Sequence, residues 1–550
     1  MRSGTPYREL FPTFTDRANL PIYYLITVLV GYAVLSRFLY GPYVPHFGGF
    51  RFVPAYLMVG AIALSGITIS YARATRSFRI LVRAIISFAL FYVVTSRFTV
   101  SDALVAGKPF ADFELNQAWL IAAICGVLGY FRPSFAIVTL QYIVWQKRQL
   151  MDVFGLAVDW LDYFTLIETG TVLIVGYLIY VGVRTRIDID PATDRAATDS
   201  AGGAAKSLVL HPVDMLVIAA VALHFGNYFF AGVIKAYIGS DLTFWFRENP
   251  TPFLTLAALE SKVLPLSFSE GLTAFAYQTM DKIFPVTNFA TIVIQLFALF
   301  AVIRVRWAIY TTLAYDVLHL TIFVLTGIFF WKFIVLNLAI VAALATIRTK
   351  KMSVALQSFL CFVVVISPFV FHIFPSYAWL DSRSMNVVRL YAVTEDEKEV
   401  QVPSNYFLGL SVTFTQHRLV WPEKGPVTTE SWGVAKSMEE MRQSLSCEWG
   451  HEKGDLPTAT FYYPKEHISR LIRRYHGQAL TMLDADGRFE YDIYPHHIFS
   501  MPWFFEDFRM LDKRRIKAYR YESETLCLDF KDGKPQHRRL WHATFDIPLL

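Results

Sequence analysis

Long apolar runs limit the folds available to this chain more than any other feature of its sequence. A helix needs about twenty residues to cross the hydrocarbon core of a bilayer, and runs of about this length recur before residue 375. Only 17% of the residues are charged, against about a quarter in soluble domains. Composition thus excludes a disordered chain and predicts a polytopic α-helical membrane domain. The runs are 20–40, 52–71, 80–98, 155–183, 212–238, 288–303, 307–329, 330–347 and 353–374.

One further apolar stretch, 118–145, is interrupted by Arg132 and Pro133. Because proline lacks a backbone donor and clashes with the preceding turn, the stretch forms either one kinked helix or two short helices. With this stretch included, the sequence predicts about 9–11 spans.

Basic residues between the runs predict the orientation, since cytoplasmic loops are enriched in Lys and Arg. A cytoplasmic N-terminus places Arg73, Arg76 and Arg79 inside. Three basic groups follow this stretch in the sequence. If 118–145 makes two passes, all three lie inside the cell and only Lys147 and Arg148 lie outside. If it makes one pass, all three groups lie outside. We therefore expect two passes and an extracytoplasmic C-terminal region. The later groups are Arg184, Arg186, Arg304, Arg306, Arg348, Lys350 and Lys351.

The net charge of +6 does not indicate a nucleic-acid partner. Residues 1–374 carry 28 Lys and Arg against 20 Asp and Glu, and residues 375–550 carry 23 against 25. The positive excess thus belongs to the apolar part, where basic residues flank membrane segments. The expected partner of this part is the lipid bilayer.

The charge and hydropathy change near residue 375 predicts two domains. Residues 1–374 form the membrane domain, and 375–550 form an extracytoplasmic globular domain of mixed α/β structure. Alternating residues predict strands, and amphipathic periods predict helices. The expected strands are 387–393 and 410–421, the expected helices are 437–445 and 467–475, and a hairpin is expected to turn at Asp532 and Gly533.

Two of the four cysteines, Cys447 and Cys527, lie in the C-terminal domain. An extracytoplasmic location permits a disulfide between them, although two free buried thiols remain the alternative. The other two, Cys125 and Cys361, lie in apolar runs.

Common sequence motifs do not identify the chemistry. The sequence contains no GxGxxG, GxxxxGK[ST], HExxH, GxSxG or CxxC pattern, so nucleotide-binding, zincin, hydrolase and thioredoxin-like sites have no motif support. No spacing matches a set of metal ligands, and no metal site is predicted. Ionisable residues inside apolar runs are costly, and they become the best functional candidates.

The strongest cluster lies in 221–246. At about 100° per residue, Lys235 and His224 differ by only about 20° around a helix. Asn227 and Tyr228 lie beside this stripe, which gives the helix a polar seam. An apolar pocket disfavours the ammonium form of a lysine, so Lys235 is a candidate base. The alternative is that Lys235 extends its ammonium group to the membrane interface.

Two other clusters contain ionisable residues. Asp316 and His319 are one helical turn apart, so the carboxylate could orient the imidazole or simply tie helices together. Glu168 lies inside its run and could pair with Lys235 or His224, either as a structural tie or in a proton path.

Two segments resemble a known family. NYFFAGVIKAYIGSDLTFWF, followed by Asn249, and YDVLHLTIFVLTGIFFWKFIVLNLAI are similar to segments of the vitamin K-dependent γ-carboxylase and the bacterial horizontally transferred transmembrane (HTTM) proteins. In that family the lysine is the base that takes part in oxygenating a reduced quinone. The strongly basic product removes a proton from a glutamate side chain, and the carbanion captures carbon dioxide.

The resemblance implies an integral membrane enzyme that uses a vitamin K hydroquinone-like cofactor on a peptide or small-molecule substrate. It carries over Lys235 as the catalytic base, and His224 and His319 are the other catalytic candidates, as hydrogen-bonding groups of the pocket. Tyr228, Asn227, Asp316 and Glu168 are then expected around the cofactor. Two alternatives remain: a proton-coupled transporter whose path includes Glu168, Lys235 and Asp316, and a scaffold whose C-terminal domain binds a partner.

Overall fold

The computed structural model describes most of the chain. The described residues are 20–40, 52–96, 111–154, 161–186, 210–347, 352–372, 378–425, 428–430, 432–447, 458–492 and 496–549. The basic residues Arg348, Lys350 and Lys351 and the expected domain boundary at 374/375 lie outside them.

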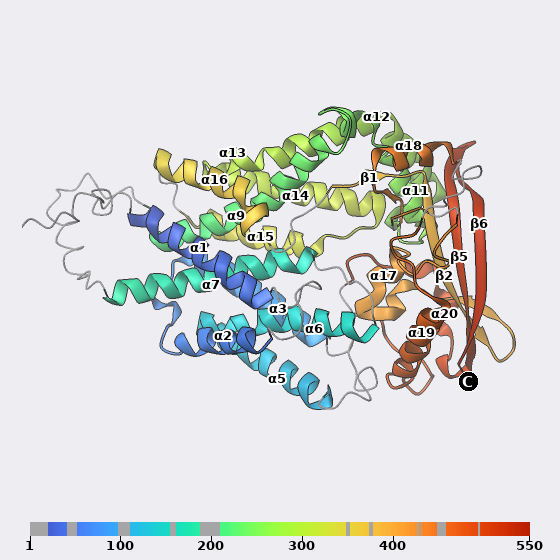
Figure 1. The fold of residues 1–550 in the computed structure, drawn as a ribbon, viewed down its shortest axis with the longest axis horizontal. Helices are drawn as coiled ribbons and strands as arrows, with labels where there is room; N and C mark the ends of the chain where they lie inside the picture. The colour runs from blue at the N-terminus through green and yellow to red at the C-terminus, as the bar shows by residue number, and fades with distance from the viewer. Residues whose placement is uncertain are drawn as a thin grey trace, which may run out of the picture.

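The described residues of the N-terminal two thirds of the chain are mostly helical, and their long helices run side by side in Figure 1. The helices before the boundary are α1 (Leu20–Tyr40), α2 (Phe52–Ser65), η5 (Tyr71–Arg73), α3 (Arg76–Ser96), α5 (Ala111–Gly129), η6 (Pro133–Phe135), α6 (Ala136–Phe154), α7 (Leu161–Arg186), α9 (Pro212–Tyr237), α10 (Phe244–Glu248), α11 (Pro252–Glu260), η7 (Pro265–Phe268), α12 (Glu270–Leu296), α13 (Ala298–Ala301), α14 (Val305–Thr326), α15 (Trp331–Ala345) and α16 (Val354–Val370).

In the described part of the chain, six helices are long and apolar enough to cross a membrane, which is compatible with a multi-pass membrane protein. Large apolar side chains such as Leu57, Phe275 and Val317 point outward from the bundle, where an aqueous surface would not favour them. Three apolar helices are shorter, and the count of 9–11 spans stays a prediction. The six are Ile22–Tyr40, Arg76–Thr95, Phe164–Val183, Pro212–Tyr237, Glu270–Ala301 and Val305–Thr326.

The interrupted stretch 118–145 forms two helices, not one. Helix α5 ends at Gly129, Pro133 begins the short 3-10 helix η6, and α6 follows directly. The two helices pack together, and Thr139 Oγ1 donates to the carbonyl of Ala122 at 2.8 Å. Proline at the first position of a helix costs no backbone hydrogen bond, so it suits this turn.

Helix α12 begins much earlier than the apolar run 288–303 predicts. It starts at Glu270, where Ser269 Oγ caps the helix by accepting from Leu272 N–H at 3.4 Å. The first half carries exposed charges and packs toward the C-terminal domain, where Tyr277 stacks on Phe530 at 4.4 Å. The apolar run therefore marks only the second half of a longer helix.

Strands appear only toward the C-terminus of the described chain, at the right end of the molecule in Figure 1. The main antiparallel sheet has the order β3-β2-β5-β6, and β1 pairs with β4. In Figure 1, α17, α19 and α20 lie on the side of the main sheet that is nearer the long helices. The elements are β1 (Leu380–Asp381), β2 (Ser384–Thr394), β3 (Glu399–Gln401), η8 (Ser404–Leu410), α17 (Ser411–Thr415), β4 (Val434–Ala435), α18 (Met438–Ser446), α19 (Lys465–Leu480), η9 (Pro502–Phe504), α20 (Glu506–Met510), η10 (Lys513–Arg515), β5 (Ile516–Lys531) and β6 (Lys534–Pro548).

Several local predictions for this region are confirmed. Strand β2 contains 387–393, and α18 and α19 cover the two expected amphipathic helices. The β5–β6 hairpin turns at Asp532 and Gly533, whose φ angles are 53° and 75°. Two positive φ values are the requirement of a type I′ turn, which explains the Asp-Gly pair.

The expected strand 410–421 is wrong. Residues 411–415 form helix α17, in which Thr415 Oγ1 donates to the carbonyl of Ser411 at 2.7 Å. Phe414 stacks on Phe407 at 3.5 Å and anchors the helix in the core. Short apolar runs do not separate helix from strand by their period alone, and packing decided this one.

Cys447 and Cys527 form a disulfide, with Cα atoms 5.8 Å apart. The bond joins the residue after α18 to strand β5. The disulfide alternative is thus confirmed, whereas Cys125 and Cys361 are free.

Candidate functional site

A cavity of about 210 Å³ lies between α9, α11, α12 and α14 and the first strand of the C-terminal domain. Its lining is mostly apolar. Among the residues predicted from sequence, Asn227, Tyr228, Lys235 and His319 line this cavity. The polar seam of α9 therefore faces it in part.

Lys235 lies in the last turn of α9 and is only 8% exposed. Its Nζ lies 5.2 Å from the ring centroid of Trp245 and 5.9 Å from that of Trp379. Such ring faces attract a cation. Within the described residues, Nζ makes no hydrogen bond or ion pair. The side chain is thus enclosed by protein and does not extend into solvent.

Asp381 is the carboxylate whose charge acts on Lys235. Its Oδ2 accepts from Asn249 Nδ2 at 2.6 Å, its Oδ1 accepts from Trp379 Nε1 at 3.0 Å, and its backbone N–H donates to Asn249 Oδ1 at 2.7 Å. Burial raises the pKa of Asp381 to about 7. The side-chain hydrogen bonds with Asn249, Trp379 and Thr251 and the charge of Lys235 oppose this rise. Asp381 can therefore change its charge near neutral pH.

Amide side chains complete the polar part of the wall. Asn288 Nδ2 donates to the carbonyl of Asn249 at 3.2 Å, and Asn288 Oδ1 accepts from Thr251 at 2.8 Å. Gln295 also lines the cavity. Its Oε1 is buried and has no hydrogen-bond partner in the described part of the chain. Because a buried acceptor without a partner is costly, Gln295 is available to a polar ligand.

His224 and Asp316 lie behind the cavity wall, where Asn337 of α15 connects them. Asn337 Oδ1 is 2.8 Å from His224 Nε2, and Asn337 Nδ2 donates to Asp316 Oδ1 at 2.7 Å and to Tyr228 OH at 3.2 Å. Among the described residues Asp316 bonds Asn337, and no bond joins it to His319, so the expected pairing of these two residues is not found. His319 instead lies among the rings of Tyr228 and other aromatic residues.

Glu168 pairs with a residue that the sequence did not suggest. Its Oε2 lies 2.5 Å from His372 Nδ1, and His372 Nε2 donates to the carbonyl of Leu223 at 2.9 Å. The expected pairing of Glu168 with Lys235 or His224 is therefore wrong. Glu168 joins α7 to the segment after α16 and does not line the cavity.

Sequence reasoning missed Asp381, Trp379, Gln295, Asn337 and His372. A search for ionisable residues passes over Asn337 and Gln295, although a buried amide inside an apolar run also needs a partner. The same rule, extended to amides, would have found both. Nothing local distinguishes Asp381, because its partner Asn249 is 132 positions away.

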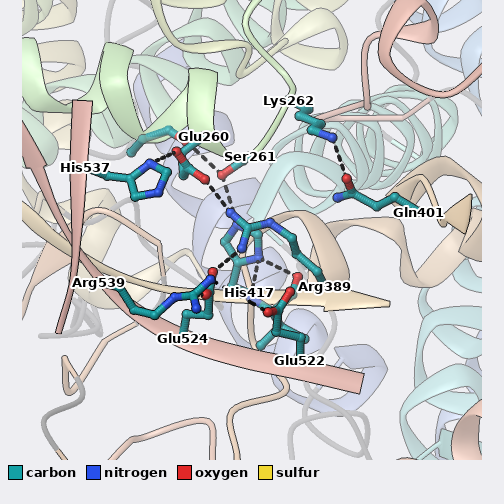
Figure 2. A network of polar contacts seen from close by, with 12 residues as sticks. Glu260, Ser261, Lys262, Arg389, Gln401, His417, Glu522, Glu524, His537 and Arg539 are labelled. Atoms are coloured by element: carbon teal, nitrogen blue, oxygen red, sulfur yellow. Dashed lines mark hydrogen bonds and ion pairs between the residues drawn. The ribbon is translucent and has the colours of Figure 1, made fainter. Parts of the chain in front are cut away.

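A second polar network lies where α11 meets the sheet, and Figure 2 shows its members pointing toward one another. Arg389 of β2 bridges Glu260 of α11 and Glu524 of β5. His537 Nδ1 lies 3.0 Å from Glu260 Oε2. Burial, assisted by the charge of Arg389, lowers the pKa of His417 to about 3. A cavity of only about 40 Å³ adjoins the network.

This network also contains a group with metal-ligand geometry. The ligand atoms of Glu522, Glu524 and His542 lie within 4.8 Å of one another, the one such group in the described residues. Glu524, however, is already ion-paired with Arg389 and Arg539. The positive charge that a cation would supply is thus present in the arginines.

No protein-family model, curated protein or solved structure matches the chain. The likeness to γ-carboxylases and HTTM proteins therefore rests on the two sequence segments and stays a prediction.

Proposed function

We propose that this chain is a multi-pass membrane enzyme that holds a reduced quinone in the α9–α14 cavity and uses Lys235 as its base. One observation carries the proposal: a lysine is enclosed beside an apolar cavity, and within the described residues it has no ion-pair partner. Desolvation favours the uncharged amine, whose lone pair is then available to take a proton from a bound hydroxyl.

The residues present fit the aromatic head of a quinol. The lining is largely apolar and includes the rings of Tyr228, His319 and Phe330. The buried Gln295 Oε1 can accept a hydrogen bond from a ring hydroxyl. A volume of about 210 Å³ is below the roughly 300–1,000 Å³ of drug-sized pockets. The ring would therefore occupy the cavity while an isoprenoid tail extends between helices.

Each residue then has a distinct role. Lys235 Nζ takes a proton from the bound hydroxyl, and ionised Asp381 stabilises the ammonium that results. Asn249 and Trp379 hold the Asp381 carboxylate in place. His224 and Asp316 act indirectly, since Asn337 lets them fix the position of the Tyr228 hydroxyl. A reduced quinone, when bound, supplies the electrons for dioxygen chemistry that drives carboxylation or a related oxidation.

We also propose the topology that basic loops predict, with a cytoplasmic N-terminus, about 9–11 passes and an extracytoplasmic domain over 375–550. The Cys447–Cys527 disulfide supports this orientation, because such bonds persist mainly in oxidising compartments.

The alternatives have weaker support. In a transporter, Glu168, Lys235 and Asp316 would share a path, but only Lys235 lines the cavity, while Glu168 and Asp316 are bonded to His372 and Asn337. A pure scaffold does not need an enclosed cavity of this size.

The decisive experiment uses the full chain in lipid nanodiscs with a reduced short-chain naphthoquinone. Quinol oxidation is followed by absorbance, and labelled carbon dioxide is traced into a glutamate-containing peptide. We expect Lys235→Ala to lower the rate by about 100-fold or more without changing the melting temperature. Ethylamine, which can occupy the space of the missing side chain, should restore part of the rate.

Lys332→Ala provides the matched control, because Lys332 is also buried but does not line the cavity. Normal activity of Lys235→Ala, or an equal loss in both variants, would contradict the proposal.

A further inference from the structure

A basic pocket lies at the end of the bundle opposite Lys235. It has a volume of about 450 Å³ and is formed by the α2–α3 and α5–α6 connections together with the start of α3. Ser77 of α3 hydrogen-bonds Asp214 in the first turn of α9. Lys235 lies in the last turn of the same helix, which places the two sites about 30 Å apart.

Three arginines converge on this basic pocket. Arg79 and Arg83 come from α3, and Arg132 precedes η6. No acidic residue lines the pocket, and within the described residues none of the three has a carboxylate partner. The basic pocket therefore concentrates positive charge that the described protein does not neutralise.

The geometry of Arg83 shows that the basic pocket is organised. Its guanidinium lies 5.1 Å from the ring centroid of Tyr71 and donates to the carbonyl of Tyr130 at 3.3 Å. Tyr71 OH in turn donates to the carbonyl of Gly129 at 2.8 Å. These contacts hold one guanidinium in a fixed position and bring the two connections together.

Apolar side chains border the same pocket. Phe131 is 67% exposed and lines it. Outside the lining, Leu64 at the end of α2 and Ile67 on the α2–α3 connection are also exposed. Phosphate groups suit arginine forks, which bind them through paired donors. A ligand with a phosphate head and an apolar body would satisfy both parts of this surface.

We propose that the basic pocket binds the phosphate head group of an anionic phospholipid, with its acyl chains along Phe131. A free phosphate lacks the apolar part and would leave that edge uncovered. Basic pockets between helices at a membrane surface favour anionic lipids for the same electrostatic reason.

The test measures lipid binding to the full chain in detergent, with phosphatidylglycerol, phosphatidylcholine or inorganic phosphate as the added probe. Native mass spectrometry counts bound lipid, and thermal unfolding reports the stabilisation. We expect phosphatidylglycerol alone to bind and to raise the melting temperature. Changing Arg79, Arg83 and Arg132 together to Gln should weaken its binding about 100-fold.

The matched control changes Arg76, Arg304 and Arg306 to Gln, because these basic residues do not line the basic pocket. Its phosphatidylglycerol affinity should stay close to that of the unchanged chain. If the triple pocket variant folds poorly, Arg132→Gln alone is compared with Arg76→Gln, and it should still weaken phosphatidylglycerol binding by about 5-fold. Equal losses in pocket and control variants, or an equal response to inorganic phosphate, would overturn the assignment.

Discussion

One half-buried and one buried cation of this molecule have opposite surroundings. Arg389, in the C-terminal domain, bridges Glu260 and Glu524, whereas Lys235 faces a cavity and two indole rings and has no ion-pair partner among the described residues. A buried ion is tolerated when opposite charges compensate its desolvation. Arg389, in contact with two carboxylates, therefore suits a structural tie, and Lys235, which has no carboxylate in ion-pair contact among the described residues, suits chemistry.

The comparison predicts its largest effect at Arg389. Replacing it with Ala removes the cation that half-buried Glu260 and buried Glu524 share, while His537 and Arg539 remain beside them. This should lower the free energy of unfolding by at most about 3–5 kcal/mol. Thermal unfolding, followed by tryptophan fluorescence, measures the change. Arg442→Ala is the control, since the exposed Arg442–Glu248 pair at 3.4 Å should contribute at most about 1 kcal/mol.

A destabilisation of Lys235→Ala as large as that of Arg389→Ala would break the distinction. It would mean that both cations are structural.

A smaller effect is expected from Asn337, which connects the cavity wall to the polar residues behind it. Asn337→Ala removes hydrogen bonds to His224, Asp316 and Tyr228. Loss of these partners should cost about 1–3 kcal/mol. In the proposed enzyme, kcat should fall more than the melting temperature implies, because Tyr228 loses its position.

Ser87→Ala provides a control, since Ser87 bonds the carbonyl of Arg83 at an exposed site. If Asn337→Ala changed stability and kcat no more than this control, Asn337 would not organise the cavity.

The remaining effects concern pH, and they should have opposite signs at the cavity and at the Arg389 network. The pKa of Asp381 rises from 3.8 to about 7, so its stabilising contribution is present below pH 3.8 and is lost as pH rises through 7. The pKa of His417 falls from 6.5 to about 3, so its contribution is present above pH 6.5 and is lost as pH falls toward 3.

Thermal unfolding of Asp381→Asn and His417→Gln across this pH range isolates each contribution as a difference from the unchanged chain. The stability advantage over Asp381→Asn should grow on acidification, and that over His417→Gln should shrink. If both stability advantages grew, or both shrank, on acidification, burial would not shift the pKa values of Asp381 and His417 in opposite directions.

Much of the local structure could be predicted because its causes are local. Apolar runs set the long helices, and Asp532 with Gly533 set the hairpin turn. The helical period correctly placed Lys235 and Tyr228 on one cavity wall. The helical period could not show that His224, on nearly the same stripe, does not line the cavity and instead bonds Asn337.

The sequence by itself therefore determined the helical and strand-bearing parts of the chain and the lysine most worth testing. Only the tertiary structure decided the partners: Asp381 with Asn249, Glu168 with His372, and Arg389 with two glutamates. The physical reason is range. Hydrophobic periodicity acts over a few turns, but these polar contacts join residues more than a hundred positions apart, and only packing brings them together.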